Sequence, residues 1–582
     1  MKAEQQRTRL LLWIAGLGAT LLVLGVAAIA LMWEDRPEKE TKPRPMVINI
    51  GGMISDAPNP GELVWNIEDR PALLSEYTQV IRTAAEDDEI SELLIHIEGI
   101  GMGWAGLQEL RDALLDFTDS GKTCMAYGDA MTNREYFLAT ACPEIYVPPA
   151  GLVFVNGLAS SVTYYADALE KVGVTANFAH VGDFKSAVEP YERTGPSEEA
   201  QEATNAMLDS LYGELVNAIS TGRGYSIETT ERIINDPPMT PEQALDEGLI
   251  DGLLFYDEAI EDRAGKKRKY FRRYLKDIRE RQLEADQYVA IIHADGAIVS
   301  GDGGADILGG RFVGDITTAE WLESARKDDD VKAVVLRVNS PGGSGLASDN
   351  IWRAVELLRE EKPVVVSMGD YAASGGYYIA MGADMIFAGP STLTGSIGVF
   401  GGKLNFAGAF DKMGVSMHHY KRGELADLFS TTQDFTDIGR ARYEQFLESF
   451  YGLFLQRVAV ARELDESAVH EVAQGRVWTG RQAHKLGLVD GIGGMNDAIR
   501  AAAALAKMDG DYGIVRLPIT KTFWDSLVDD LATTAVKPQP DLGALIALVP
   551  GGEETIRNVR AVSRALEPTG VAAMLDYTID IR

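Results

Sequence analysis

Residues 334–343 read Val-Val-Leu-Arg-Val-Asn-Ser-Pro-Gly-Gly, and a helical pattern of apolar residues follows over Ala347–Leu358. A short aliphatic run that enters a Gly-rich turn and then a helix is typical of a buried β-strand. The next aliphatic run, Pro363–Met368, predicts a second strand. Strand, helix and strand in this order predict right-handed βαβ crossovers and a largely parallel sheet that helices cover on both faces. We therefore expect an α/β fold.

The same pattern occurs earlier in the chain. Residues 93–97 read Leu-Leu-Ile-His-Ile, and a Gly-containing turn and a helical pattern follow them. Glycines of the two regions match at a recurring offset of 241 positions, as Gly128 and Gly369 do. Similarity that extends over such a length indicates a tandem duplication. We place the first repeat at 46–265 and the second at 287–508.

The N-terminus predicts a membrane anchor. Residues 10–33 contain no charged side chain, and this length is enough to span a hydrocarbon core of about 30 Å. Three basic residues precede it, so the positive-inside rule places residues 1–9 in the cytoplasm and the rest of the chain across the membrane. A cleaved signal peptide is the alternative, but its apolar region is only about 7–15 residues long. Residues 34–45, charged and Pro-rich, are expected to be a tether.

Two further segments lie outside the repeats. Residues 266–286 are rich in Lys and Arg and predict a basic linker helix, solvated and paired with the acidic body of the protein. Contact of this linker with anionic lipid headgroups is the alternative. Residues 509–582 are expected to be a C-terminal appendage for packing or assembly, without chemistry of its own.

Charge and composition exclude several classes of function. The 582 residues include 55 basic and 87 acidic side chains, and the resulting net charge of −32 disfavours nucleic acid as a partner. Only two cysteines are present, Cys124 and Cys142, which excludes a Cys-rich metal site. One disulfide and two buried thiols both remain open for this pair. The seven histidines form no zincin-type pair, so we expect no metal.

A serine and a glycine turn carry the candidate chemistry. Residues 372–378 read Ala-Ala-Ser-Gly-Gly-Tyr-Tyr and place Ser374 between a predicted strand and a helix, where its hydroxyl is free beside the N–H of Gly375. A close-packed helix entry is the alternative. Gly342 and Gly343 leave backbone N–H groups unobstructed, as an oxyanion hole requires. The Lys-Ser/Thr pair of a phosphate-binding P-loop is absent from this turn.

A serine nucleophile needs a base, because its hydroxyl is weakly nucleophilic at its ordinary pKa. The nearest downstream histidines, His418 and His419, are predicted to lie on a strand edge, and no aspartate is placed to orient either of them. A lysine is the other candidate. It can act as the base if burial lowers its pKa from about 10.4 to about 7–8.

Four motifs together resemble the signal peptide peptidase A (protease IV) family of membrane-anchored Ser/Lys peptidases. They are residues 336–343, 372–378, Pro390–Val399 and Val181–Pro190, and the resemblance extends over the anchor and both repeats of the long, tandem form. It implies tandem βαβ units related to the Clp protease and crotonase folds. It also implies a serine endopeptidase that needs no cofactor and degrades remnant signal peptides and other peptides near the membrane.

The resemblance also implies the roles of individual residues. Ser374 would be the nucleophile and Lys185 its general base, while Ser396 would orient the lysine. The backbone N–H groups of Gly343 and Gly375 would form the oxyanion hole. The first repeat would thus supply the lysine, and the second repeat the serine.

The repeat offset provides an independent test of this division. The position of the first repeat that matches Ser374 is Asn133, and the position of the second repeat that matches Lys185 is Ala426. Each repeat lacks a group that the other carries, so we expect one site assembled from both, within one chain or between neighbouring chains. A surface lysine and a coincidental pattern are the alternative.

The expected setting follows from the anchor and the resemblance. We expect a single-pass protein of a bacterial inner membrane with its catalytic body on the periplasmic side, assembled as a homo-oligomer, with a tetramer as one form. Two other functions stay open. A crotonase-like acyl-CoA enzyme would use the Gly-rich turns to stabilise an enolate, and a catalytically dead membrane scaffold would bind peptides without cleaving them.

Overall fold

The computed structural model describes residues 42–58, 70–238, 240–305, 310–508, 512–517 and 572–574. The predicted cytoplasmic segment 1–9, the predicted anchor 10–33 and most of the tether 34–45 lie outside the described residues. Within the described ranges, no helix has the length and apolar character needed to cross a membrane. Both repeats belong to one compact unit that begins at Pro45.

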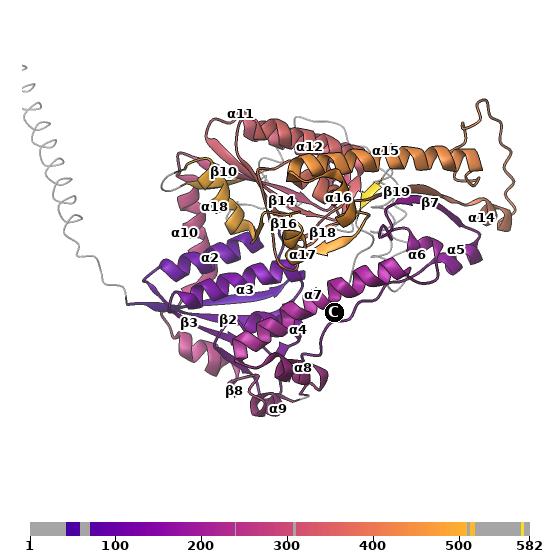
Figure 1. Ribbon diagram of the computed structural model, residues 1–582. Helices are drawn as coiled ribbons and strands as arrows, with labels where there is room; N and C mark the ends of the chain where they lie inside the picture. The colour runs from indigo at the N-terminus through magenta and orange to yellow at the C-terminus, as the bar shows by residue number, and fades with distance from the viewer. Residues whose placement is uncertain are drawn as a thin grey trace, which may run out of the picture. The chain divides into compact units, whose positions relative to one another are not determined.

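The first repeat is built on a six-stranded sheet of order β8-β5-β3-β2-β1-β9, in which β2, β3, β5 and β8 pair in parallel. Helices α2 and α3 pack against each other beside this sheet (Figure 1). The strand predicted at residues 93–97 lies inside β2. The bounds are β1 (Arg44–Gly52), α2 (Leu74–Glu86), β2 (Ile90–Ile100), α3 (Trp104–Asp119), β3 (Thr123–Tyr127), β5 (Glu144–Val147), β8 (Gly252–Leu253) and β9 (Lys269–Tyr270).

The predicted basic linker contributes to this first sheet. Its residues form β9, which pairs in parallel with β1, and α10 (Phe271–Leu283). One side of α10 is buried through Tyr274, Leu275 and Ile278. Two of its basic side chains pair with acidic residues of the first repeat: Lys269 Nζ lies 2.6 Å from a carboxylate oxygen of Glu89, and Arg279 lies 2.7 Å from Glu76.

The second repeat contains an eight-stranded sheet whose main path is β20-β18-β16-β14-β10-β22, with β17 and β21 joined at β16. Strands β22, β10, β14, β16 and β17 are parallel, as the sequence predicts. Strand β18 is also parallel to β16, whereas β20 runs antiparallel to β18. The bounds are β10 (Tyr288–Asp295), β14 (Val331–Ser340), β16 (Val364–Ala373), β17 (Met385–Ala388), β18 (Leu393–Gly395), β20 (Val477–Thr479), β21 (Gly491–Ile492) and β22 (Gly513–Leu517).

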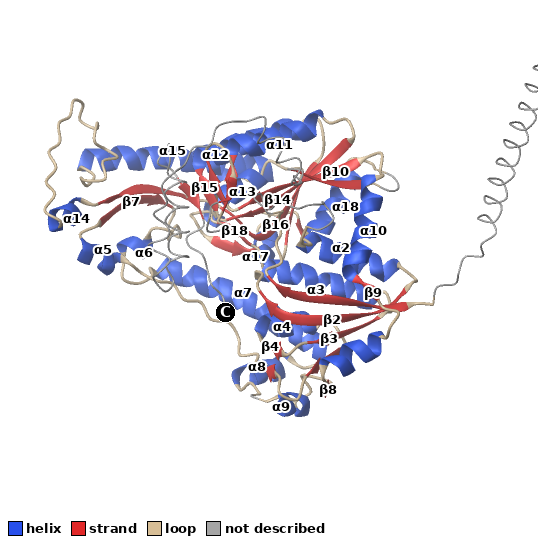
Figure 2. Ribbon diagram, turned by 180° about the vertical axis from the view of Figure 1, so that it is seen from behind, coloured by secondary structure: helices blue, strands red, loops and turns tan. Residues whose placement is uncertain are grey.

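Helices cover both faces of this second sheet. Successive side chains of a strand point to opposite faces. Val334 and Leu336 accordingly join the core beneath α12 (Gly345–Arg359), while Val335 packs against α18 (Met495–Leu505). Helices α11 (Asp315–Lys327), α12 and α15 (Asp437–Arg462) lie together on one side of β14 and β16 (Figure 2). The predicted parallel sheet with two covered faces is therefore correct.

A third sheet joins the two repeats within one chain. Its order is β12-β13-β11-β15-β23-β19-β7. Strand β7 of the first repeat runs antiparallel to β19 of the second, from Val181 opposite Val399 to Thr175 opposite Asn405 (Figure 1). The bounds are β7 (Thr175–Val181), β11 (Ala297–Val299), β12 (Gly304–Ala305), β13 (Arg311–Gly314), β15 (Gly342–Ser344), β19 (Val399–Asn405) and β23 (Ala572–Met574).

Shorter elements complete the fold. The helices are α4 (Asn133–Ala139), α5 (Ala166–Val172), α6 (Glu189–Glu192), α7 (Glu198–Arg223), α8 (Ile227–Asn235), α9 (Pro241–Asp246), α13 (Gly375–Ala380), α14 (Ala407–Lys412), α16 (Glu466–Val472) and α17 (Gly480–Lys485). The segment Asp257–Asp262 is a π-helical turn, and β4 (Ala130–Met131) pairs with β6 (Leu152–Val153).

The structure decides two further points. Cys124 and Cys142 are buried and joined by a disulfide, with a Cα–Cα distance of 4.9 Å. The strand edge predicted around His418 and His419 is wrong, because these residues lie in an exposed loop between α14 and α15. Apolar residues alternate with polar ones in this loop, as in a strand, but residues 415–420 form no strand and Met417 is 45% exposed.

Candidate active site

The structure brings Lys185, Ser374 and Ser396 together in the interior of one chain. Lys185 Nζ lies 3.1 Å from Ser374 Oγ and 2.7 Å from Ser396 Oγ. The backbone carbonyl oxygen of Ser396 is 3.2 Å from the same nitrogen. All three residues have 0% of their surface exposed. An amine and two hydroxyl groups therefore meet in a site shielded from bulk water.

Ser374 lies at the predicted turn between a strand and a helix, and its backbone is strained there. It follows β16, precedes α13 and has φ of 55° and ψ of −112°. A non-Gly residue in such a conformation costs about 1–3 kcal/mol, and residues of this kind cluster at functional sites. The N–H of Ser374 donates to the carbonyl of Gly395, and its own carbonyl accepts from Tyr378. The backbone therefore fixes the direction of the hydroxyl.

Ser396 lies in a turn between two strands, β18 and β19, and its backbone also has a positive φ. Its φ is 49°, and its N–H donates to the carbonyl of Arg476 at 2.7 Å. Among the described residues, five non-Gly residues have a positive φ, and Ser374 and Ser396 are two of them. Both serines that contact Lys185 therefore have a strained backbone.

A glycine that sequence reasoning missed sets the position of Lys185. A Cβ atom on Gly475 would lie 2.6 Å from the backbone nitrogen and Cα of Lys185. The carbonyl of Gln474 accepts from the N–H of Phe184, and the N–H of Gly475 donates to Ile397. The chain at 474–475 thus packs directly against the turn that carries the lysine. In the sequence Gly475 is a single glycine outside any motif, so the sequence alone does not indicate this contact.

The two predicted oxyanion residues lie on elements that pack against each other. Gly343 is the central residue of β15, and Gly375 is the first residue of α13. A Cβ atom on Gly343 would lie 2.0 Å from the carbonyl oxygen of Ile298, so only Gly fits this strand pairing. A Cβ atom on Gly376, the second residue of α13, would lie 2.6 Å from the carbonyl oxygen of Ser340. Glycines therefore allow the close approach of β15, α13 and their neighbours.

A buried ionic cluster underlies the turn at 339–343. The guanidinium group of Arg337, 2% exposed, lies 2.7 Å from Asp56 and 2.9 Å from Glu109. It also donates to Ser367 at 2.6 Å. Burial opposes the charge of Arg337, but the two carboxylates outweigh it and raise the pKa of Arg337 above its ordinary value. Asp56 and Glu109 come from the first repeat, so the cluster links the repeats beneath the candidate site.

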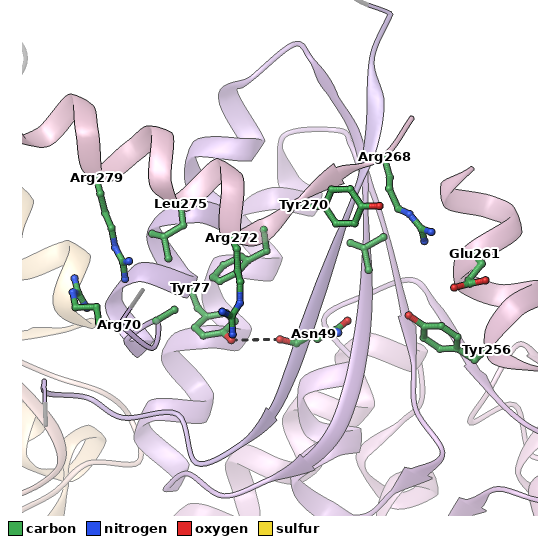
Figure 3. A pocket seen from close by; sticks show the side chains of 13 residues that line it. Asn49, Arg70, Tyr77, Tyr256, Glu261, Arg268, Tyr270, Arg272, Leu275 and Arg279 are labelled. Atoms are coloured by element: carbon green, nitrogen blue, oxygen red, sulfur yellow. Dashed lines mark hydrogen bonds between the residues drawn. The ribbon is translucent and has the colours of Figure 1, made fainter. Parts of the chain in front are cut away.

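A cavity of about 530 Å³ lies away from these residues. We call it the basic cavity, because four arginines line it together with aromatic side chains and Glu261. Figure 3 shows Arg70, Arg272 and Arg279 on one side of it and Arg268 on the other. None of the predicted catalytic residues lines it. Within the described part of the chain, no group of three His, Cys, Asp or Glu residues is arranged to hold a metal ion.

The chain is similar to a peptidase family and to proteins named as proteases. The model of Peptidase family S49 matches residues 116–269 and again residues 356–509. Protease 4 from Salmonella typhi is 33% identical over 515 residues, which cover 84% of this chain and 82% of that protein. The chloroplastic serine protease SPPA from Arabidopsis thaliana is 34% identical over 437 residues, and the match spans 73% of this chain and 64% of the plant protein.

Among solved structures, a ClpP1 mutant from Listeria monocytogenes aligns with 38% of this chain and 98% of its own length. The sequence identity is 13% and the TM-score is 0.24.

Proposed function

This chain belongs to peptidase family S49 and is a serine peptidase, and from this premise we propose that Ser374 is its nucleophile and Lys185 its general base. The observation that carries the proposal is the 3.1 Å distance between Lys185 Nζ and Ser374 Oγ in a fully buried site. The histidines considered earlier as bases, His418 and His419, lie in an exposed loop.

Ser396 has a defined part in this proposal. A neutral lysine amine carries two hydrogens and one lone pair. The hydroxyl and the carbonyl oxygen of Ser396, at 2.7 Å and 3.2 Å, can accept the two hydrogens. The lone pair is then directed at the hydroxyl hydrogen of Ser374. Ser396 therefore orients the base without taking part in proton transfer.

The proposed reaction is acyl transfer through two steps. Lys185 takes the proton of the Ser374 hydroxyl while the oxygen attacks the peptide carbonyl, and the N–H groups of Gly343 and Gly375 stabilise the negative charge that develops on the carbonyl oxygen. The protonated lysine then gives its proton to the leaving amine. Water, deprotonated by the same lysine, hydrolyses the acyl-enzyme and frees Ser374. Besides the peptide and one water molecule, the proposed steps use side chains and backbone groups of this protein.

We further propose that the protein is anchored in a bacterial inner membrane by residues 10–33 and cleaves remnant signal peptides and other peptides there. The uncharged 24-residue segment and the basic residues before it support the anchor and its orientation. A disulfide between Cys124 and Cys142 agrees with a periplasmic catalytic body, because disulfides persist in oxidising compartments. Assembly as a homo-oligomer, such as a tetramer, and a Clp/crotonase-like architecture of each repeat belong to the same proposal.

Hydrolysis of a fluorogenic signal-sequence peptide by the detergent-purified full chain tests this function. We expect Ser374→Ala and Lys185→Ala each to lower kcat by at least about 100-fold, because each change removes a reacting group. Ser391→Ala and Lys403→Ala are matched controls, since both residues are buried but do not contact the site. Retained turnover in Ser374→Ala would contradict the proposal, whereas absence of peptide hydrolysis by the wild-type chain would favour an acyl-CoA enzyme or a scaffold.

A further inference from the structure

Three strands of the second repeat part from one another next to the candidate site. Strand β10 ends at Asp295 and leads into β11, and β14 ends at Ser340 and leads into β15. Strand β16 ends at Ala373, directly before Ser374. Strands β11 and β15 pair with each other at Gly343. The position of Gly343 relative to Ser374 therefore depends on how the three strands are held together where they part.

The pairing of β14 with β16 is interrupted at this point. Between Val338 and Ser340, the partner residue on β16 advances from position 368 to position 372, so residues 369–371 lie opposite Asn339 alone. Such a bulge bends its strand, and bulges next to active sites redirect the residues that follow them. This bulge ends three residues before Ser374.

Asn339 forms hydrogen bonds to both neighbouring strands at the bulge. Its Nδ2 donates to Asp295 Oδ1 at 3.1 Å, and its Oδ1 accepts from the N–H of Tyr371 at 3.2 Å. Its backbone carbonyl accepts from the N–H of Gly296 at 3.0 Å. Asp295 and Gly296 lie at the end of β10, and Tyr371 is part of the bulge in β16. One residue thus links the ends of β10, β14 and β16.

The carboxylate that accepts from Asn339 is itself held in place by Arg311. The guanidinium group of Arg311 pairs with Asp295 and donates to the carbonyl of Ala57 at 3.1 Å and to Ser55 Oγ at 3.0 Å. Burial and the nearby charge of Asp56 raise the pKa of Asp295, while Arg311 acts in the opposite direction. Ser55 and Ala57 belong to the first repeat, so both repeats contribute to the position of this carboxylate.

We propose that Asn339 is a positioning residue for the oxyanion hole. The chain continues from Asn339 to Gly343 on β15, and from Tyr371 to Gly375 on α13, so the Asn339 side chain sets the separation of the two donor N–H groups. The inference rests on the proposed function, which takes these glycines as the donors. Both N–H groups must lie about 2.7–3.1 Å from the same oxygen, so a small shift of one strand weakens stabilisation of the oxyanion.

Asn339→Asp tests this role with almost no change in volume. The new carboxylate still accepts from the N–H of Tyr371, but an oxygen replaces Nδ2, which lies 3.1 Å from Asp295 Oδ1. Two carboxyl groups this close share one proton, and the pKa of the pair is raised. Below that pKa, the shared proton bridges them as the amide does. Above it, two negative charges repel each other and push the strands apart.

The measured quantity is the ratio of kcat between the variant and the wild type at pH 6 and at pH 9. The ratio removes the pH dependence that both proteins share through Lys185. We expect the ratio for Asn339→Asp to fall at least about tenfold from pH 6 to pH 9, with KM within about twofold, because the defect lies in stabilisation of the transition state. An equal ratio at the two pH values would overturn the inference.

A second substitution distinguishes positioning from general damage. Asp295→Asn places an amide opposite the carboxylate introduced by Asn339→Asp, so the double variant restores an amide–carboxylate pair with the roles exchanged. We expect the double variant to exceed Asn339→Asp alone at least about fivefold in kcat at pH 9. Absence of any recovery would overturn the inference, because the contact between the two positions would then not be the source of the loss.

Asn405 on β19 provides a matched control. Its Nδ2 donates to Asp434 Oδ1 at 2.8 Å, and its Oδ1 accepts from the N–H of Ala407 at 3.0 Å. Asn405→Asp therefore creates a similar pair of carboxyl groups, at the end of β19 that is distant from Ser396. We expect its kcat to stay within about twofold of wild type at both pH values. A fall as large as that of Asn339→Asp would overturn the inference.

If Asn339→Asp does not fold, Asn339→Ala replaces it, since it removes both side-chain hydrogen bonds. A loss of at least about tenfold in kcat with KM within about twofold supports the inference, and unchanged kcat overturns it. Failure of the proposed function has a different result. Absence of peptide hydrolysis by the wild-type chain would overturn both, whereas an unaffected Asn339 variant of an active chain would overturn this inference alone.

Discussion

Lys185 Nζ and Ser374 Oγ lie 3.1 Å apart, although 189 positions separate the two residues in the sequence and they belong to different repeats. The pairing of β7 with β19 explains this proximity, because Lys185 follows β7 by a few residues while β19 follows the turn that holds Ser396. One chain therefore contains a complete Lys–Ser–Ser arrangement. In this duplicated chain, the first repeat therefore needs to keep only the lysine and the second repeat only the two serines.

Removal of the Ser396 hydroxyl should reduce catalysis only in part. Ser396→Ala deletes the acceptor 2.7 Å from Lys185 Nζ but leaves the carbonyl acceptor at 3.2 Å. We expect kcat to fall about 10- to 100-fold with little change in KM, since the base is still present but less well oriented. Steady-state hydrolysis of a fluorogenic peptide measures both constants. A loss as large as that of Lys185→Ala, or none, would show that Ser396 does not act by orienting the lysine.

Gly475 should be required for activity through its contact with Lys185. Gly475→Ala would place a Cβ atom 2.6 Å from the lysine backbone, whereas Gly487→Ala would meet no atom within 4 Å. The φ angles of the two glycines are 81° and 74°, so both substitutions introduce similar backbone strain of about 1–2 kcal/mol. We expect both variants to unfold at lowered temperatures, with the larger decrease in Gly475→Ala because of its additional clash, and only Gly475→Ala to lose at least about tenfold in the kcat of the folded protein.

This comparison separates displacement of the base from general destabilisation. Thermal unfolding reports the strain, and peptide hydrolysis reports the position of the amine. Equal activities of the two variants would contradict the role given to the 474–475 segment.

Glu76 should make stability depend on pH in the acidic range. Burial alone would raise the pKa of Glu76, but Arg516, Arg279 and Arg70 outweigh it and lower the pKa to about 2. A depressed carboxyl pKa stabilises the fold above the pKa of the unfolded chain, about 4.5, and this contribution is lost as the pH falls towards 2.

We therefore expect Glu76→Gln to lower the free energy of unfolding by about 3 kcal/mol at pH 7, with a smaller difference at pH 3. Denaturant unfolding at the two pH values measures this change. Glu86→Gln, at the exposed end of the same helix, should change stability little at either pH. A difference between wild type and Glu76→Gln that is equal at pH 7 and pH 3 would show that the ion pairs with arginine are not its source.

Mixing of inactive chains tests whether one chain supplies the whole site. When Lys185→Ala and Ser374→Ala chains are co-expressed and purified together, each lacks one member of its own site. We expect the mixture to stay as inactive as each variant alone, because β7 pairs with β19 of the same chain. Recovery of a substantial fraction of wild-type turnover would show that lysine and serine meet across neighbouring chains.

Much of the fold follows from local patterns. The aliphatic run at residues 334–338 lies inside β14, and the helical pattern after it lies inside α12, because alternating burial on two faces selects a strand between two layers of helices. The repeat offset and the family motifs also indicate Lys185, Ser374 and Ser396, which the structure brings together. The spacing of residues left open whether this happens within one chain, since the register of β7 on β19 is a long-range property.

Other features leave no local signal in the sequence. Arg337 lies in an aliphatic strand, and only the folded chain shows that Asp56 and Glu109 of the other repeat neutralise it. The segment 509–582 shows no motif, yet residues 513–517 and 572–574 add strands to two different sheets. Such pairings use backbone groups that every residue has, so side-chain patterns do not reveal them.

Labelling with a fluorophosphonate tests the central claim most directly, because the reagent reacts with a serine that a neighbouring base has activated. The full chain is incubated with the reagent, and the modified peptide is identified by mass spectrometry. The expected result is one adduct, on Ser374, that forms at least about 100-fold more slowly in Lys185→Ala. An adduct on another serine, or equal labelling rates with and without Lys185, would contradict the account.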